Sequence, residues 1–203
     1  MRSENEKREA RRSVSDEEHQ EPPAPDQPSP RMLAWSRNST LYRLSRRMMT
    51  ERELADAIAR KARQKFEDIT ETQVKALAEA AVTFGRTMLA LDDQAYAEIR
   101  TRSSARSGKS KRAISRKLIE KGVDREIVQQ AVAETDDFLP ALVFARKRAF
   151  GPFRRPDVVL DDKREAKEFS AFARNGFSFE IGRKVMVMDR DEAEELLADR
   201  PFD

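Results

Sequence analysis

Apolar residues recur every three or four positions through most of the chain after residue 38, which is the spacing that places them on one face of a helix. Two such stripes are Leu54, Ile58 and Ala62, and Ala166, Phe169 and Ala173. Runs rich in Val, Ile, Thr and Tyr, which are typical of strands, are almost absent, and the best candidate, residues 184–188, also fits a helix. The pattern therefore predicts an all-α protein.

Polar residues that cap helices precede most of these apolar stretches. Thr50 and Thr70 each begin a capping box, in which the threonine oxygen accepts from the amide three residues later while Glu53 or Gln73 bonds back. Later helices are expected to begin after Asp92 or Asp93, Ser110, Asp124, Asp136 or Asp137, Asp161 or Asp162, and Ser178. A short helix over 40–46 should open the series, and an acidic helix over 191–198 should close it.

The sequence repeats itself with an offset of 54 residues. Residues 118–127 correspond to residues 172–181, and Gly122 and Gly176 occupy the same place in the two segments. A glycine just after a helix can adopt the positive φ that ends the helix without a Cβ clash, and a capping residue two positions later starts the next helix. Each segment therefore predicts a tight helix–turn–helix unit.

Each of these units follows one more helix, so the repeat comprises three helices. Residues 38–87 offer a less exact copy, which lacks the glycine between its main helices. Because tandem repeats contact mainly their neighbours, we expect an elongated array of three three-helix repeats, over 38–87, 88–135 and 136–190. The charged, proline-rich residues 1–37 are expected to form a disordered tail, and residues 191–203 an acidic tail.

Basic residues are concentrated in the middle of the chain, although the net charge is only +3. Residues 97–125 contain ten basic and three acidic side chains, and residues 146–155 contain five basic side chains and no acidic one. Such a run can be a solvated helix face, but it also fits a surface that meets phosphates or an acidic partner. Few aromatic residues intersperse the cluster, which argues against base stacking as its main grip.

The sequence offers little that could catalyse a reaction. It contains no cysteine, and its only histidine, His19, lies in the expected tail, so thiol chemistry, histidine chemistry and Cys/His metal sites are not expected. Residues 107–110 end like a P-loop, but Ser103 stands where that motif needs a glycine. Aspartate pairs such as Asp136-Asp137 lie at predicted helix starts, where capping is a better interpretation than metal binding. We therefore expect no cofactor, no metal and no enzymatic activity.

The order of these motifs resembles that of the RecX family, whose members consist of three tandem three-helix repeats. The second repeat of that family opens with an acidic pair before an aromatic residue and alanine, like residues 91–97 here. It ends with a helix carrying Leu-x-x-Lys-Gly and an apolar residue, like residues 118–123. A basic residue before Gly-Phe-Ser, as in residues 174–178, is similar to the third repeat, and residues 41–54 resemble the first.

The resemblance covers about residues 40–188 and implies a function. About ten extra residues around 151–162 and the long N-terminal tail depart from the family pattern. The resemblance implies a non-enzymatic regulator that binds the RecA recombinase filament on single-stranded DNA, lodges in its helical groove, and inhibits its ATPase and strand exchange. Such a regulator also restrains the role of RecA in DNA repair and the SOS response.

On this interpretation, stacked repeats would align the basic side chains into one continuous strip that faces the filament. The residues expected in it are Arg100, Arg102, Arg106, Lys109, Lys111, Arg112, Arg116, Lys117, Lys121, Arg146, Lys147 and Arg148. No apolar run is long enough to cross a membrane, and the N-terminus lacks the apolar segment of a secretory signal. We therefore expect a cytoplasmic protein that does not enter a membrane. We also expect a monomer whose partner is the RecA filament, with weak direct DNA binding in addition.

An alternative hypothesis places the chain in a different class of protein. Tight helix–turn–helix units with a basic helix also suit a protein that binds duplex DNA directly, such as a transcription factor or a nucleoid protein. That hypothesis predicts sequence-selective duplex binding with a steep salt dependence and no need for a recombinase. Binding assays with duplex, single strand and recombinase filament separate the two hypotheses.

Overall fold

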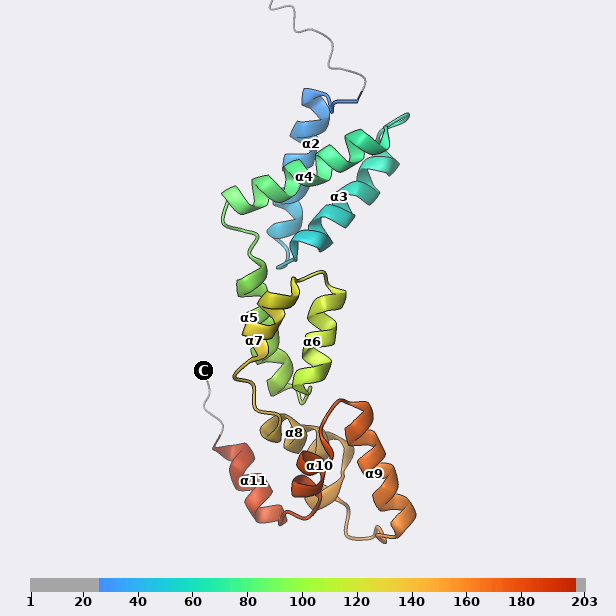
Figure 1. The fold of residues 1–203 in the computed structure, drawn as a ribbon, viewed down its shortest axis with the longest axis vertical. Helices are drawn as coiled ribbons and strands as arrows, with labels where there is room; N and C mark the ends of the chain where they lie inside the picture. The colour runs from blue at the N-terminus through green and yellow to red at the C-terminus, as the bar shows by residue number, and fades with distance from the viewer. Residues whose placement is uncertain (1–25, 200–203) are drawn as a thin grey trace, which may run out of the picture.

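The computed structural model describes residues 26–199, in which all regular secondary structure is helical. The α-helices are α2 (Pro30–Leu44), α3 (Glu51–Lys65), α4 (Glu71–Thr87), α5 (Asp93–Arg106), α6 (Lys111–Glu120), α7 (Arg125–Val132), α8 (Phe138–Arg148), α9 (Asp162–Arg174), α10 (Phe179–Met186) and α11 (Arg190–Ala198), and a short 3-10 helix, η1, covers Gly151–Phe153. They form three groups, α2–α4, α5–α7 and α8–α11, stacked along an elongated molecule (Figure 1). The prediction of an all-α array of three repeats is confirmed.

Within the described residues, the first helix begins earlier than the sequence indicated. α2 starts at Pro30, inside the expected tail, so the short helix over 40–46 and the tail boundary at residue 37 were wrong. Proline suits the first position of a helix because its missing N–H would have no partner there, and the Ser29 hydroxyl oxygen accepts from the Met32 amide at 3.3 Å. Trp35 then packs edge-on against Phe66 of the same repeat. Residues 1–25 of the expected tail lie outside the described residues.

Each repeat has its own apolar core. In the first repeat, Leu54, Ile58 and Leu77 are fully buried between α3 and α4, and both expected capping boxes are present. In the second repeat, Ile114 and Leu118 of α6 pack on α5 and α7. The burial of these helical faces fixes which side chains of each helix point outward.

The two glycine turns found in the sequence have the same geometry. Gly122 and Gly176 have φ values of +87° and +88°. In each turn the amide that follows the glycine donates to a carbonyl five residues back, with Val123 to Leu118 and Phe177 to Phe172 both at 3.1 Å. This hydrogen bond closes the helix and directs the chain into the next one. The repeated pattern in the sequence is therefore a repeated turn in the structure.

Neighbouring repeats are joined by two equivalent junctions at the start of a middle helix. The Thr50 hydroxyl, which caps α3, donates to the Lys121 carbonyl oxygen at 2.7 Å, and the Ser110 hydroxyl, which caps α6, donates to the Asn175 carbonyl oxygen at 2.6 Å. In each junction the hydroxyl oxygen accepts a hydrogen bond from an amide of its own helix. The hydroxyl proton is donated to a backbone carbonyl at the glycine turn of the next repeat. As a result α3, α6 and α9 follow one another along the right edge of the view in Figure 1.

The second aspartate of the pairs Asp92-Asp93 and Asp136-Asp137 completes these junctions. Asp93 accepts from the amide of Glu51 at 2.9 Å, and Asp137 accepts from the amide of Lys111 at 2.6 Å. Asp137 therefore makes no capping bond to its own helix, α8, contrary to the simple capping interpretation. Burial raises the pKa of both carboxyl groups, although the hydrogen bond from the backbone amide acts in the opposite direction.

The third repeat differs most from the sequence-based prediction. Phe172 and Glu168 are buried on α9 and Phe169 packs against the same core, whereas Ala166 and Ala173 are exposed, so the inferred stripe was wrong at both alanines. Glu168 tolerates burial because Arg154, from the extra segment before α9, donates to it at 2.8 Å.

The C-terminal segment is also part of the fold. The acidic helix expected over 191–198 is present as α11, but it does not belong to a tail, because its Ala193 and Leu197 pack into the core of the third repeat. The acidic residues of this helix lie on its other side, where Glu194 is 3.5 Å from Arg146. The third repeat is therefore a group of four α-helices, and residues 200–203 lie outside the described residues.

Candidate interaction surface

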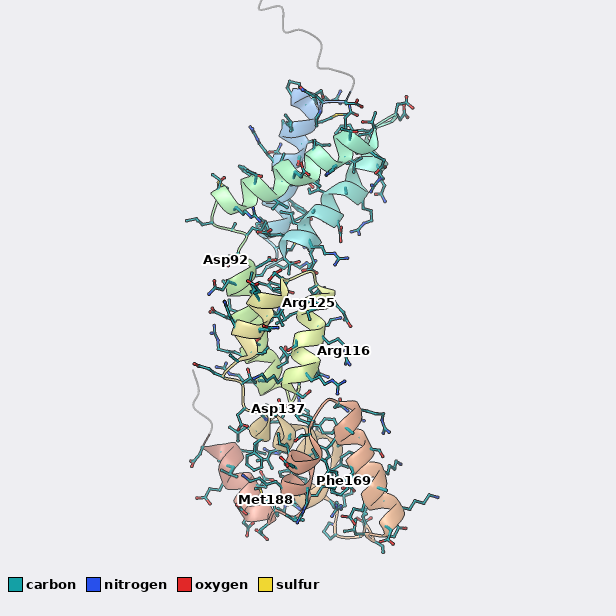
Figure 2. The ribbon with its side chains drawn as sticks, in the orientation of Figure 1. Asp92, Arg116, Arg125, Asp137, Phe169 and Met188 are labelled. Atoms are coloured by element: carbon teal, nitrogen blue, oxygen red, sulfur yellow. The ribbon has the colours of Figure 1, made fainter. Side chains whose placement is uncertain are left out.

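The outward face of α6 carries a group of exposed cations. Because Ile114 and Leu118 point into the core of the second repeat, Arg112, Arg116 and Lys117 point away from it. Figure 2 shows Arg116 on the outer edge of α6, about midway along the molecule. We call Arg112, Arg116 and Lys117 the α6 surface.

The α6 surface keeps most of its positive charge. Within residues 26–199, Arg112 and Arg116 form no ion pair. Lys117 lies 3.1 Å from Glu120, but both side chains are more than half exposed, so this pair is screened by water and is worth little. An anionic partner would therefore meet uncompensated guanidinium groups here.

Two other expected cations, Arg102 and Arg106, face a different side of the second repeat. They line a groove of about 1100 Å³ between α5, α7, the start of α8 and Leu197 of α11. No residue of α6 lines this groove, and Figure 1 places α11 to the left and α6 to the right. The α6 surface and this groove are therefore two separate sites.

Several of the remaining expected cations serve the structure. The Lys111 ammonium group donates to the Ala133 carbonyl oxygen, and that of Lys147 donates to the Ser107 carbonyl oxygen, each at 2.8 Å. Lys121 donates to Glu53 of the first repeat at 2.5 Å. Burial alone would raise the pKa of Glu53, but its bonds to Lys121 and to the Thr50 amide, with the nearby positive charges, bring it below the ordinary value. Lys121 is thereby largely neutralised within the junction.

The other expected residues do not extend the α6 surface either. The guanidinium of Arg100 lies over the Tyr96 ring, 5.3 Å from its centre, and that of Arg148 lies 5.9 Å from the centre of the Phe144 ring. Arg146 approaches Glu194 of α11, and Lys109 is exposed in the turn before α6. The twelve residues therefore do not form the single continuous strip that we expected.

Two exposed arginines that the sequence analysis left out flank the α6 surface. Arg52 of α3 packs its side chain against Gly122, at one end of α6. Arg174 stands at the end of α9, two residues before Gly176, and Gly176 lies against Arg112 at the other end of α6. Arg174 could have been located from the sequence, because it stands two residues before the repeated Gly176, whereas only the packing of the first repeat on the second places Arg52 against Gly122.

The described part of the chain holds no obvious metal site and no helix suited to a bilayer. Among residues 26–199, no group of three or more His, Asp or Glu side chains lies close enough together to bind a metal ion. In the same range, no helix combines the length and the apolar character needed to cross a membrane.

Comparison with known proteins gives a consistent result. Residues 92–132, which contain α5 to α7, match the model of the second three-helix domain of RecX. A protein named regulatory protein RecX from Agrobacterium fabrum is 64% identical over 176 residues, which cover 87% of this chain and 95% of that protein. The protein of the same name from Myxococcus xanthus is 33% identical over 88% of this chain and 96% of its own length.

The fold also has a counterpart among solved structures. The crystal structure of RecX from Lactobacillus salivarius superimposes with a TM-score of 0.60 over 81% of this chain and 98% of that one. At 22% sequence identity, this likeness concerns the fold alone. Taken with the sequence relatives, it shows that the chain belongs to the RecX family.

Proposed function

We propose that this protein is a non-enzymatic regulator of the RecA recombinase filament on single-stranded DNA, and that the α6 surface contacts the filament. Membership of a family whose relatives are named regulatory proteins supports the regulatory role. The observation that supports the α6 surface is its pair of exposed arginines without an ionic partner in the described chain. Filament phosphates or acidic recombinase side chains would supply the missing negative charge.

The elongated shape of the molecule fits inhibition by contact with several recombinase subunits at once. An elongated body with hydrogen-bonded junctions between its repeats can lie along a helical groove and touch several successive recombinase subunits. A body fixed to several subunits opposes the relative movements that turnover and strand exchange require, because each movement would break contacts with one of them. Inhibition of the ATPase then needs no catalytic group from this chain.

Charge reversal on α6 tests this function. The variant with Arg112→Glu, Arg116→Glu and Lys117→Glu should lose at least about tenfold in its potency as an inhibitor of RecA ATP hydrolysis on single-stranded DNA, because repulsion replaces attraction at the contact. Its helix content, measured by circular dichroism, should match the parent, since all three side chains are exposed.

A matched control reverses three exposed lysines of the first repeat, Lys61, Lys65 and Lys75, to glutamate. This control changes the net charge equally and should retain most of the inhibition. Inhibition by the α6 variant at the parental level, with normal helix content, would contradict the proposed contact. Equal loss in both variants would show that net charge, rather than the α6 surface, governs inhibition.

A further inference from the structure

The first repeat contains a second basic site, outside the α6 surface and outside the twelve cations expected from the sequence. A pocket of about 400 Å³ opens between the C-terminal end of α2 and the adjoining face of α3. Its wall contains one exposed aromatic residue and four arginines, namely Tyr42, Arg43, Arg46, Arg47 and Arg60. So many guanidinium groups around a small pocket indicate an anionic ligand.

The acidic residues in the wall do not cancel this charge. Glu53 is bound by Lys121 from outside the pocket at 2.5 Å, and Asp56 lies 3.9 Å from Arg52, which is also outside it. Of the four arginines, only Arg47 forms an ion pair in the described chain, at 3.6 Å from Glu53. The pocket therefore retains a clear excess of positive charge.

One of these arginines has a buried donor without an acceptor. The Nε of Arg43 is enclosed by the protein, and residues 26–199 supply it with no hydrogen-bond partner. That nitrogen is enclosed and is not itself open to a ligand, but the Arg43 side chain lines the pocket and, without an acidic partner among the described residues, adds its positive charge to it. Phosphate oxygens match the flat, forked geometry of guanidinium better than most acceptors.

The rim of the pocket provides a flat platform for a ring. Tyr42 is 62% exposed, whereas most tyrosine side chains are largely or partly buried. The guanidinium of Arg46 lies over its ring, 5.3 Å from the centre, and donates to its hydroxyl oxygen at 2.9 Å. Exposed aromatic rings and arginine planes beside a basic groove are the features on which unpaired bases stack.

We propose that this pocket binds single-stranded nucleic acid directly, with a backbone phosphate against Arg43 and Arg60 and an adjacent base on Tyr42. A duplex could offer the phosphate but not the base, because its bases are already paired and stacked. The site goes beyond the proposed function, since it lies on another repeat and requires no recombinase.

Fluorescence anisotropy of the full chain at low salt, with a short labelled oligothymidine, tests the phosphate contacts. The variant with Arg43→Gln and Arg60→Gln should bind about fivefold more weakly or worse, and with a shallower salt dependence, because it neutralises fewer phosphates. The matched control, with Arg31→Gln and Arg37→Gln on exposed positions of α2, should change affinity less than about twofold. Equal affinities for the two variants would overturn the site.

If Arg43→Gln reduces helix content, Arg60→Gln alone carries the test, because that side chain is exposed.

The base contact has its own test. Tyr42→Ala should weaken binding of oligothymidine about fivefold or more, but should leave binding of an abasic strand of equal length, and of a duplex, nearly unchanged. Equal losses on all three ligands would overturn the stacking contact. Both comparisons are repeated in the chain with the reversed α6 surface. The pocket substitutions should weaken binding there by the same factors, which separates the pocket from the α6 surface. If they no longer weaken binding in that background, the pocket is not an independent site.

Discussion

Gly176 links local backbone geometry to the contact between repeats. Its φ of +88° is one that other residues adopt only with strain, and an added Cβ would lie 2.6 Å from the Ser110 hydroxyl oxygen. That hydroxyl makes the junction hydrogen bond to Asn175. A single atom added at this position therefore strains the turn and displaces the residue that holds the third repeat against the second.

Gly176→Ala should lower the free energy of unfolding by about 1–2 kcal/mol or more, measured by urea denaturation. Gly182→Ala is the matched control, because its added Cβ would meet Phe172 at an ordinary 3.5 Å within a regular helix. That control should be neutral or slightly stabilising, since alanine favours a helix. Similar losses in both variants would contradict this account of the turn.

At the residue scale, the sequence predicted caps and turns better than burial. Thr50, Thr70 and Ser110 could be identified because a helix cap is a local interaction, determined by residues three positions apart. The burial of Glu168 could not, because it depends on Arg154, which reaches it from a segment with no repeat counterpart. A charged residue on a predicted outer face gives no local sign that a partner will cover it.

At the scale of elements, the junctions between repeats explain why aspartates occur in pairs. Asp136 accepts from the Phe138 amide at the start of its own helix, whereas Asp137 accepts from the Lys111 amide of the preceding repeat. The sequence showed the pair and its position, but not the division of roles. That division depends on how two repeats pack, and local spacing does not contain this information.

Asp137→Ala should lower the free energy of unfolding by about 1–3 kcal/mol, because the Lys111 amide would lose its acceptor at the junction. Asp137→Asn keeps an oxygen at that position and should recover most of the loss. Urea denaturation of the two variants beside the parent measures both effects. A loss in the asparagine variant as large as in the alanine variant would show that the oxygen acceptor is not what matters.

The same junction predicts a trend with pH. Because burial raises the pKa of Asp137 in the folded state, the stability it contributes is present below its unfolded pKa and is lost as the pH rises through the folded pKa. Asp137→Asn does not titrate, so its stability relative to the parent should improve between acidic and neutral pH. Urea denaturation of both proteins across that range measures the difference, and a trend of opposite sign would contradict the role of burial.

At the scale of the whole molecule, the sequence predicted the array but not the distribution of its charges. The internal repeat and the spacing of the caps were enough to predict stacked three-helix units. Arg102 and Arg116 nevertheless face different sides, because α5 borders the groove near α11 while α6 lies on the outer edge. Helical periodicity assigns a face on each helix, but the packing of helices and repeats decides which faces join.

Recognition of the assembled filament is tested most directly by co-sedimentation at moderate salt. The parent protein should sediment with RecA on single-stranded DNA, and not with RecA alone or with the strand alone, because weak phosphate contacts are lost as salt rises. The chain with Arg112→Glu, Arg116→Glu and Lys117→Glu should remain in the supernatant. Sedimentation of that variant at the parental level, or binding of the parent to the bare strand as strong as to the filament, would contradict filament recognition through α6.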